Sequence, residues 1–254
     1  MTRTLLAAAG VVALAYLAIC VLVFAFQRSL IYFPQPREPG APAPTLVLAV
    51  DGTDVLVTVR PGSGSEALIY FGGNAENVSY SLPDLARAFP EHSLYLMHYR
   101  GYGGSGGKAS EAALFADGLA LFDRVHAERS TITVVGRSLG SGVAVHVASR
   151  RPVARLVLVT PYDSIEALAI QQFPYLPVRW LLRDKFDSGR EAPAITAPTL
   201  LIAAEHDEVI PRASTEALLS RFSAGVASLG VVAGAGHNTI AERPEYGRLL
   251  SGRP

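Results

Sequence analysis

The sequence predicts an α/β protein built on one open, mostly parallel sheet with helices on both faces. From about residue 45 onward, short apolar runs alternate with helical patterns, which is typical of strands joined by crossover helices. The later runs are continuous and rich in Val, Leu and Ile, as expected for strands that helices cover on both faces. In addition, a serine between glycines stands where one such strand should turn into a helix.

Each element of this fold can be given approximate bounds from the apolar periodicity. Strands are expected at residues 46–50, 54–59, 67–71, 93–98, 131–135, 155–160, 199–204 and 228–233. Helices are expected at residues 77–89, 110–128, 139–150, 212–222 and 239–250. The first two strands are close enough together to form a hairpin, which would add an antiparallel edge to the parallel sheet.

One stretch, about residues 161–198, interrupts the alternation. It holds two short helical patterns with large apolar side chains, among them Phe173, Tyr175 and Trp180. An insertion of this kind after a sheet strand predicts a small helical cap over the active site. The same side chains would also suit a helix pair packed into the core, and the two interpretations are compatible.

The N-terminus predicts a membrane anchor. Residues 5–26 carry no charge, and at ~1.5 Å per residue they are long enough to cross a hydrocarbon layer of ~30 Å. A cleaved signal peptide usually has a shorter apolar region that ends at small residues, whereas this run ends in Phe24-Ala25-Phe26. We therefore expect an uncleaved transmembrane helix within residues 1–27.

The segment after the anchor predicts a link to the membrane surface. Residues 28–44 combine basic and aromatic side chains with a stiff proline-rich spacer, and the globular domain is expected to span residues 45–254. Arg3 and the terminal amine nearly balance Arg28 and Arg37, so the positive-inside count favours neither side of the membrane for this domain.

The composition excludes several classes of function. Lys and Arg number 22, as do Asp and Glu, so nothing in the charge balance indicates a nucleic-acid partner. The single cysteine, Cys20, rules out an internal disulfide. No paired Cys or His spacing typical of zinc ligands occurs, and we expect neither a metal nor another cofactor. The oligomeric state has no signature in the sequence.

The G-R-S-L-G run at residues 136–140 is the strongest functional motif. A β-branched run precedes it and a helix of small residues follows, which predicts a nucleophile elbow that presents the Ser138 hydroxyl to a substrate. The glycines on either side are required because a Cβ would clash in so tight a turn. A second match, around Ser105, has no apolar helix behind it, so we interpret it as a loop.

A serine nucleophile needs a base and an acid that orients the base. Strand 199–204 is followed by Asp207, and strand 228–233 is followed by His237, so both should lie at the carboxyl edge of the sheet with Ser138. The chain order Ser138, Asp207, His237 is the order expected on this type of sheet.

Other side chains could fill these two roles. Glu205, Glu208 and Asp163 are alternative acids, and of these Asp163 follows strand 155–160, from where an acid can also be supplied. His206 is the nearest rival base, but it precedes Asp207 in the same turn.

Two backbone N–H groups should form the oxyanion hole. One is expected from Leu139, directly after the nucleophile. The other is expected from the glycine-rich loop after strand 67–71, where we favour Asn74, with Gly73 as the alternative.

With these residues in place, the chain resembles the α/β-hydrolase superfamily and is most similar to membrane-anchored serine hydrolases of the Bem46 and ABHD type. The matching pieces are FQRSLIYFPQP, YFGGNAEN, YRGYGGSGG, VGRSLGSG, TPYDS, EHDEVIP and GAGHN, in order over roughly residues 27 to 240. The family usually has His-Gly-Asn in the oxyanion loop, whereas this chain has glycine at position 72.

The resemblance implies hydrolysis of a carboxylic ester or thioester through an acyl-enzyme, with small-molecule or lipid-like acyl substrates. A peptidase of the same fold and a non-catalytic binding module of that fold are the alternatives. The complete set of Ser138, Asp207 and His237 favours an enzyme.

Overall fold

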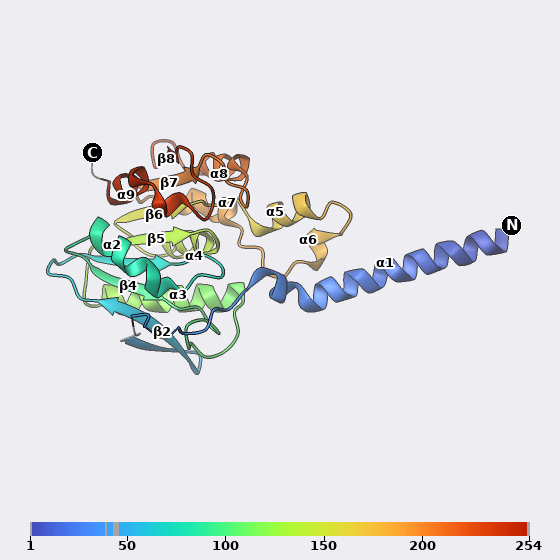
Figure 1. Ribbon diagram of the computed structural model, residues 1–254, viewed down its shortest axis with the longest axis horizontal. Helices are drawn as coiled ribbons and strands as arrows, with labels where there is room; N and C mark the ends of the chain where they lie inside the picture. The colour runs from blue at the N-terminus through green and yellow to red at the C-terminus, as the bar shows by residue number, and fades with distance from the viewer. Residues whose placement is uncertain (1, 39, 43–45, 253–254) are drawn as a thin grey trace.

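The structure is a computed structural model that describes residues 2–38, 40–42 and 46–252 (Figure 1). A long helix, α1, projects from a domain in which one twisted sheet lies between two layers of helices. Residue 45, the expected start of the domain, and part of the proline-rich spacer lie outside the described residues.

The sheet has eight strands in the order β1-β2-β4-β3-β5-β6-β7-β8. The β1–β2 and β2–β4 pairs are antiparallel and every other pair is parallel. The strands are β1 Leu46–Val50, β2 Thr53–Arg60, β3 Ala67–Phe71, β4 Ser93–Met97, β5 Ile132–Arg137, β6 Arg155–Val159, β7 Thr199–Ala204 and β8 Ala227–Val232. The predicted mostly parallel sheet with an antiparallel hairpin at its edge is thus confirmed.

Helices cover both faces of this sheet, and the core lies on both sides of it. On one face α3, α4 and α8 bury side chains such as Phe122, Val143 and Leu218, and on the other α2 and α9 bury Leu85 and Leu250. Apart from α1, the helices are η1 Val78–Ser81, α2 Leu82–Ala88, α3 Glu111–His126, α4 Leu139–Ala148, α5 Ile165–Gln172, α6 Val178–Leu181, α7 Ser188–Glu191, η2 Ala192–Ala194, α8 Arg212–Leu219, η3 Ile240–Glu242 and α9 Pro244–Ser251. Two expected helices, 77–89 and 239–250, each divide into a short 3₁₀ turn and an α-helix.

Helix α1 runs from Thr2 to Ile31 and is exposed over most of its length. Its length and apolar composition are sufficient to cross a membrane. It continues through residues 28–31, which the sequence placed in the interfacial segment, because no glycine or proline occurs between Gly10 and Pro34.

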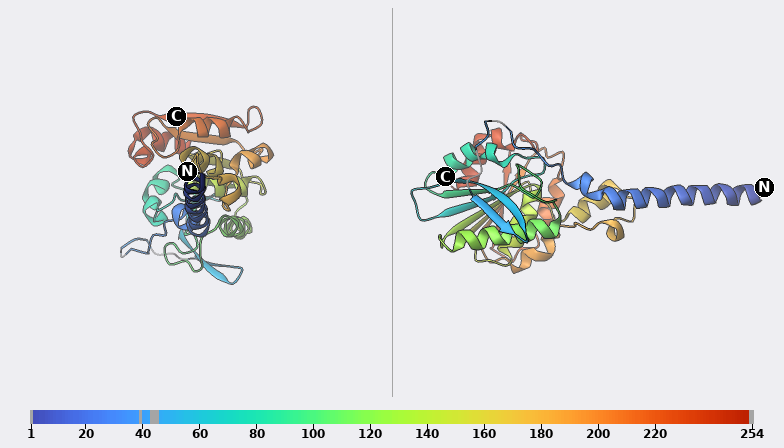
Figure 2. Two further views of the ribbon diagram at one scale, coloured as in Figure 1. Left: turned by 90° about the vertical axis from the view of Figure 1, so that its right-hand side faces the viewer. Right: turned by 90° about the horizontal axis from the view of Figure 1, so that it is seen from below.

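The segment predicted as a cap divides into two parts. Residues 165–182, which hold α5 and α6 and which we call the cap, stand off the domain beside the C-terminal half of α1 (Figures 1 and 2). Residues farther along the chain, including Phe186 and Ile195, are buried in the main core. The second part of the segment therefore packs into the core, as one interpretation of the sequence expected, whereas a cap over the active site stays a prediction for residues 165–182.

Candidate active site

The turn between β5 and α4 has the geometry of a nucleophile elbow. Ser138 has φ 50° and ψ −119°, a backbone conformation that a residue with a side chain adopts only under strain. Its N–H donates to Val159 O on the neighbouring strand at 2.9 Å. A Cβ on Gly140 would lie 2.1 Å from Phe71 O, which explains why a glycine is needed two positions after the serine.

His237 lies directly against this serine. Its Nε2 is 3.0 Å from Ser138 Oγ, and its ring is almost completely buried, with the residue 5% exposed. Its Nδ1 lies 2.9 and 3.0 Å from the two oxygens of Asp207. Since a carboxylate only accepts, Nδ1 carries a proton toward Asp207, and Nε2 is left to accept the proton of the Ser138 hydroxyl.

Asp207 is itself held in place by the turn that follows β7. Its Oδ1 accepts the N–H groups of Val209 and Ile210 at 3.0 and 2.7 Å. These bonds fix the carboxylate, and the carboxylate in turn fixes the orientation of the imidazole. The three side chains that the sequence predicted for the site are therefore brought together by loops at one edge of the sheet.

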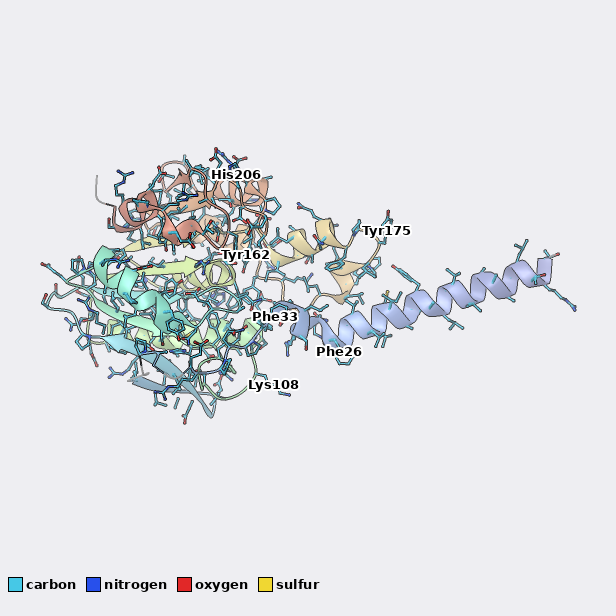
Figure 3. All side chains as sticks on the ribbon, viewed as in Figure 1. Phe26, Phe33, Lys108, Tyr162, Tyr175 and His206 are labelled. Atoms are coloured by element: carbon cyan, nitrogen blue, oxygen red, sulfur yellow. The ribbon has the colours of Figure 1, made fainter. Side chains whose placement is uncertain are left out.

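The rival serine and the rival histidine lie in other environments. Ser105 Oγ donates to His98 O at 2.8 Å and accepts from Leu56 N at 2.9 Å, so its hydroxyl stabilises a buried turn. The His206 side chain is 71% exposed and lies at the outer surface (Figure 3).

The rival acids also have other partners. Glu205 Oε2 accepts from Gly234 N at 2.7 Å, and Glu208 Oε2 accepts from the backbone N–H of His237 at 3.1 Å. Asp163 is 4.0 Å from Arg221, and burial raises the pKa of its carboxyl above the usual range. Asp207 is the acid that contacts the imidazole of His237.

The expected oxyanion loop lies beside the nucleophile, at the end of β3. A Cβ built on Gly73 would be 3.6 Å from Ser138 Cβ. The Gly73 N–H donates to Glu76 Oε2 at 2.6 Å, so Gly73, the alternative donor, is not available for an oxyanion. Among the described residues no partner is present for the N–H of Asn74 or of Leu139, the two donors that the sequence favours.

The Asn74 side chain anchors this loop. Its Oδ1 accepts from Tyr102 Oη at 2.9 Å and from the backbone N–H of Phe33 at 3.0 Å. Phe33 lies just beyond the end of α1, so the oxyanion loop is bonded to the segment that leaves the long helix.

A buried ion pair that the sequence analysis missed connects the loops of the site. Glu76 Oε2 lies 3.1 Å from Arg137 Nη1, and Arg137 Nη2 donates to His237 O at 3.3 Å. Glu76 Oε1 accepts from Tyr70 Oη and Ser81 Oγ at 2.8 and 2.6 Å. Burial, together with the Glu76 charge, raises the pKa of Tyr70 well above its usual range, so this phenol stays a neutral donor.

The glycine at position 72, where the resembling family usually has histidine, also has a structural reason. A Cβ there would lie 2.4 Å from Val78 Cγ1 and 3.2 Å from Glu76 Oε2. The Gly72 carbonyl accepts from Tyr99 Oη at 2.7 Å. In this chain, hydrogen bonds to Glu76 and Tyr99 hold the loop. The neighbouring Val78 and Glu76 side chains leave no room for a side chain at position 72.

No group of three or more His, Cys, Asp or Glu side chains with metal-binding geometry occurs among residues 2–38, 40–42 and 46–252. The side chains and backbone groups brought together at the elbow are a hydroxyl, an imidazole, a carboxylate and the N–H groups of Leu139 and Asn74.

A mostly parallel sheet with a strained serine at the β5–α4 turn defines the α/β-hydrolase fold. The chain belongs to the serine hydrolase family, whose model matches residues 117–252. Its relatives place it with the Bem46 and ABHD type of this fold.

Two of these relatives cover most of the chain. An uncharacterized protein of Mycobacterium tuberculosis is 35% identical, over 96% of this chain and 89% of that protein. The bem46 protein of Schizosaccharomyces pombe is 27% identical, over 74% of this chain and 72% of that protein. Among solved structures, the Pyrococcus furiosus esterase Pf2001 matches with a TM-score of 0.69 and 18% identity, covering 87% of this chain and 99% of that one.

Proposed function

We propose that this hydrolase is anchored to a membrane by α1 and cleaves a carboxylic ester or thioester through an acyl-enzyme. The observation that carries the proposal is the continuous hydrogen-bonded array from Ser138 through His237 to Asp207. It stands beside a loop whose Asn74 N–H is unpaired, so the site has both a nucleophile with its base and donors for a developing negative charge.

In the first step Ser138 Oγ attacks the carbonyl carbon while its proton passes to His237 Nε2. The carbonyl oxygen becomes an oxyanion, which accepts hydrogen bonds from the N–H groups of Leu139 and Asn74. When this intermediate collapses, the alcohol or thiol leaves with the proton from His237, and the acyl group stays on Ser138.

Water completes the cycle. It attacks the acyl carbon, gives one proton to His237 Nε2 and forms a second oxyanion in the same place. Collapse releases the carboxylic acid, and the proton returns from His237 to Ser138 Oγ. Asp207 holds the imidazole and stabilises its protonated form in both halves.

The proposal is tested with the full chain in detergent micelles, by labelling with a fluorophosphonate and by hydrolysis of p-nitrophenyl esters. Ser138→Ala should abolish labelling and lower kcat by a factor on the order of 10³ or more, because the nucleophile is lost. Ser105→Ala, at the serine of the second motif, is the control and should keep both activities if circular dichroism shows it folded.

Two outcomes would contradict the proposal. Full activity of Ser138→Ala would show that the nucleophile is elsewhere. A folded wild-type protein that neither reacts with the probe nor cleaves any ester would favour a non-catalytic module.

A further inference from the structure

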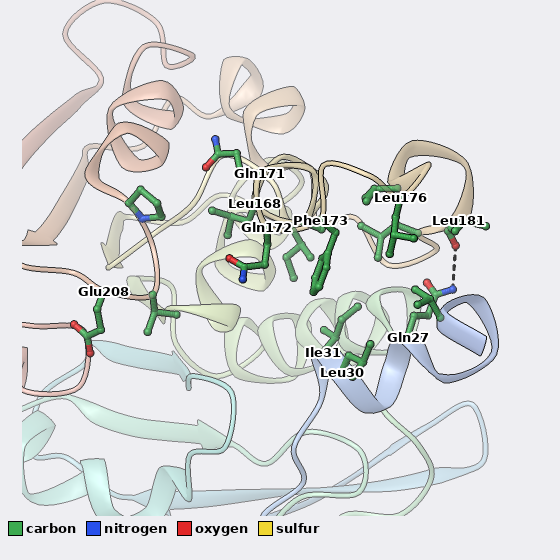
Figure 4. A pocket seen from close by; sticks show the side chains of 17 residues that line it. Gln27, Leu30, Ile31, Leu168, Gln171, Gln172, Phe173, Leu176, Leu181 and Glu208 are labelled. Atoms are coloured by element: carbon green, nitrogen blue, oxygen red, sulfur yellow. Dashed lines mark hydrogen bonds between the residues drawn. The ribbon is translucent and has the colours of Figure 1, made fainter. Parts of the chain in front are cut away.

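A largely apolar cavity of about 480 Å³ lies between the end of α1 and the cap (Figure 4). This volume is within the ~300–1,000 Å³ that is typical of small-molecule sites. Most of its walls come from two parts of the chain that are far apart in sequence. Val23, Leu30 and Ile31 of α1 line one side, and Leu168, Phe173 and Leu176 of the cap line the other.

One end of this cavity reaches the catalytic loop. Glu208 and Val209, which directly follow Asp207, contribute to its wall. Glu208 also accepts the backbone N–H of His237 at 3.1 Å, so this wall and the catalytic base belong to one hydrogen-bonded unit. Figure 4 shows Glu208 at one end of the cavity and Gln27 at the other.

The cap that forms one wall of the cavity also carries exposed apolar surface. We call residues 173–180 the cap tip. In it Tyr175, which Figure 3 labels, is 88% exposed, Trp180 is 87% exposed, and Phe173 is also exposed. The hydroxyl of Tyr16 donates to Tyr175 O at 2.9 Å. Since Tyr16 lies in the middle of the uncharged run of α1, a bilayer crossed by that run would also surround the cap tip.

Polar contacts at the base of α1 hold the two walls together. Gln27 donates to Leu181 O at 3.0 Å and accepts from Arg183 N at 2.7 Å. Both Arg28 Nε and Tyr32 Oη donate to Asp184 at 3.0 Å. The cavity is therefore built with α1 as one of its walls.

We propose that this cavity binds the acyl chain of a bilayer lipid ester, which enters sideways between α1 and the cap tip. The inference rests on the proposed hydrolase function, because it places the ester carbonyl at Ser138. Three observations support it: the walls of the cavity are largely apolar, the adjoining cap tip exposes Tyr175 and Trp180, and one end of the cavity lies at Glu208, next to Asp207.

The test compares p-nitrophenyl palmitate with p-nitrophenyl acetate, using the full chain in phosphatidylcholine vesicles. Leu176→Trp fills the cavity from the cap and should lower kcat/KM for palmitate by about tenfold or more, with acetate changed by less than about twofold. The adjacent Tyr175→Trp places the same side chain outside the cavity and should leave both substrates nearly unchanged. Equal losses on both esters, or no loss on palmitate, would overturn the proposal.

A second readout is independent of turnover. Palmitic acid with a diazirine at its chain end, photolysed in the same vesicles, should label cavity-lining residues such as Leu168 and Ile31 in wild type and in Tyr175→Trp but not in Leu176→Trp. Wild-type label found only on residues 5–22, Tyr175 or Trp180, which do not line the cavity, would overturn the cavity proposal. A wild-type protein that is photolabelled on the cap but neither hydrolyses the acetate ester nor reacts with the fluorophosphonate would instead overturn the hydrolase function alone.

Discussion

At the scale of single residues, the site depends on a carboxylate that does not belong to the catalytic array. Glu76 accepts from the Gly73 N–H and pairs with Arg137, whose guanidinium reaches His237 O. The side chains of both members of the pair are largely buried. Glu76 is therefore a positioning residue: it holds the oxyanion loop, the elbow and the histidine loop in one arrangement.

Glu76→Gln should reduce both stability and turnover. It leaves the Arg137 charge buried without a partner, which should cost about 3–5 kcal/mol in the free energy of unfolding. With the loop loosened, kcat should fall by a factor on the order of 10², with KM little changed, as for the loss of an oxyanion donor. Urea unfolding and ester hydrolysis by the full chain measure the two effects.

Glu128→Gln is the matched control, because it removes an exposed partner of Arg124 and should change stability by less than about 1 kcal/mol. A Glu76→Gln protein that is less stable yet keeps its wild-type kcat would show that the carboxylate serves only the fold.

The difference between Ser138 and Glu76 shows how far sequence reasoning reaches at this scale. The close approach of Ser138, Asp207 and His237 could be predicted because each follows a strand and their order matches the topology. An acid in a glycine-rich turn has the same sequence pattern whether it is solvated or, like Glu76, buried against an arginine. The sequence also could not decide whether Gly73 or Asn74 supplies the oxyanion donor, because only the fold shows that the Gly73 N–H is bonded to Glu76.

At the scale of elements, the close approach of α4 to the sheet sets the elbow. A Cβ on Gly140 would lie 2.1 Å from Phe71 O and 2.5 Å from Gly72 O, and both are backbone atoms that cannot move without shifting β3. The first turn of α4 therefore has room only for glycine at this position.

Gly140→Ala should destabilise the protein by about 3 kcal/mol or more, because overpacking against a rigid backbone forces the helix off the sheet. Gly247→Ala in α9 is the control: nothing lies within 4 Å of the added Cβ, and the gain in helix propensity should stabilise by about 0.5–1 kcal/mol. Thermal and urea unfolding of both variants decide the matter, and a Gly140→Ala protein as stable as wild type would contradict this account.

Elements were the most predictable level, since buried parallel strands are continuous apolar runs with clear ends. The expected strands 46–50, 67–71 and 199–204 match β1, β3 and β7 in both bounds. The helix ends deviate by a few residues, because capping by side chains such as Ser110 decides where α3 begins.

At the scale of the whole molecule, the long helix is part of the catalytic domain's structure. The Asp184 carboxylate, which is 5% exposed and lies just after the cap in the sequence, pairs with Arg28 and accepts from Tyr32 Oη. Burial, with the Asp184 charge beside it, raises the pKa of Tyr32 well above its usual range, which keeps this phenol a donor. Contacts of this kind link positions about 150 apart in sequence and leave no trace in local patterns.

Asp184→Asn should loosen the base of α1. The charge-assisted bonds to Asp184 should contribute about 1–2 kcal/mol to the stability of this segment, after allowance for the exposure of Arg28. Their loss should therefore speed amide hydrogen exchange in residues 28–35 by about tenfold. Asp123→Asn, which breaks an exposed pair with Arg151, should leave exchange in that segment unchanged. Equal exchange in wild type and Asp184→Asn would show that this carboxylate does not hold the helix.

The bond between Phe33 N and Asn74 Oδ1 has a kinetic consequence for a protein anchored by α1. It leaves almost no free chain between the last turn of the helix and the oxyanion loop, so the catalytic centre cannot swing out to sample the aqueous phase. For the bilayer lipid ester proposed as substrate, encounters would then occur by lateral diffusion in two dimensions. The variable that sets the rate is the mole fraction of substrate in the surrounding lipid, and inert lipid acts as a diluent even when the total amount of substrate is fixed.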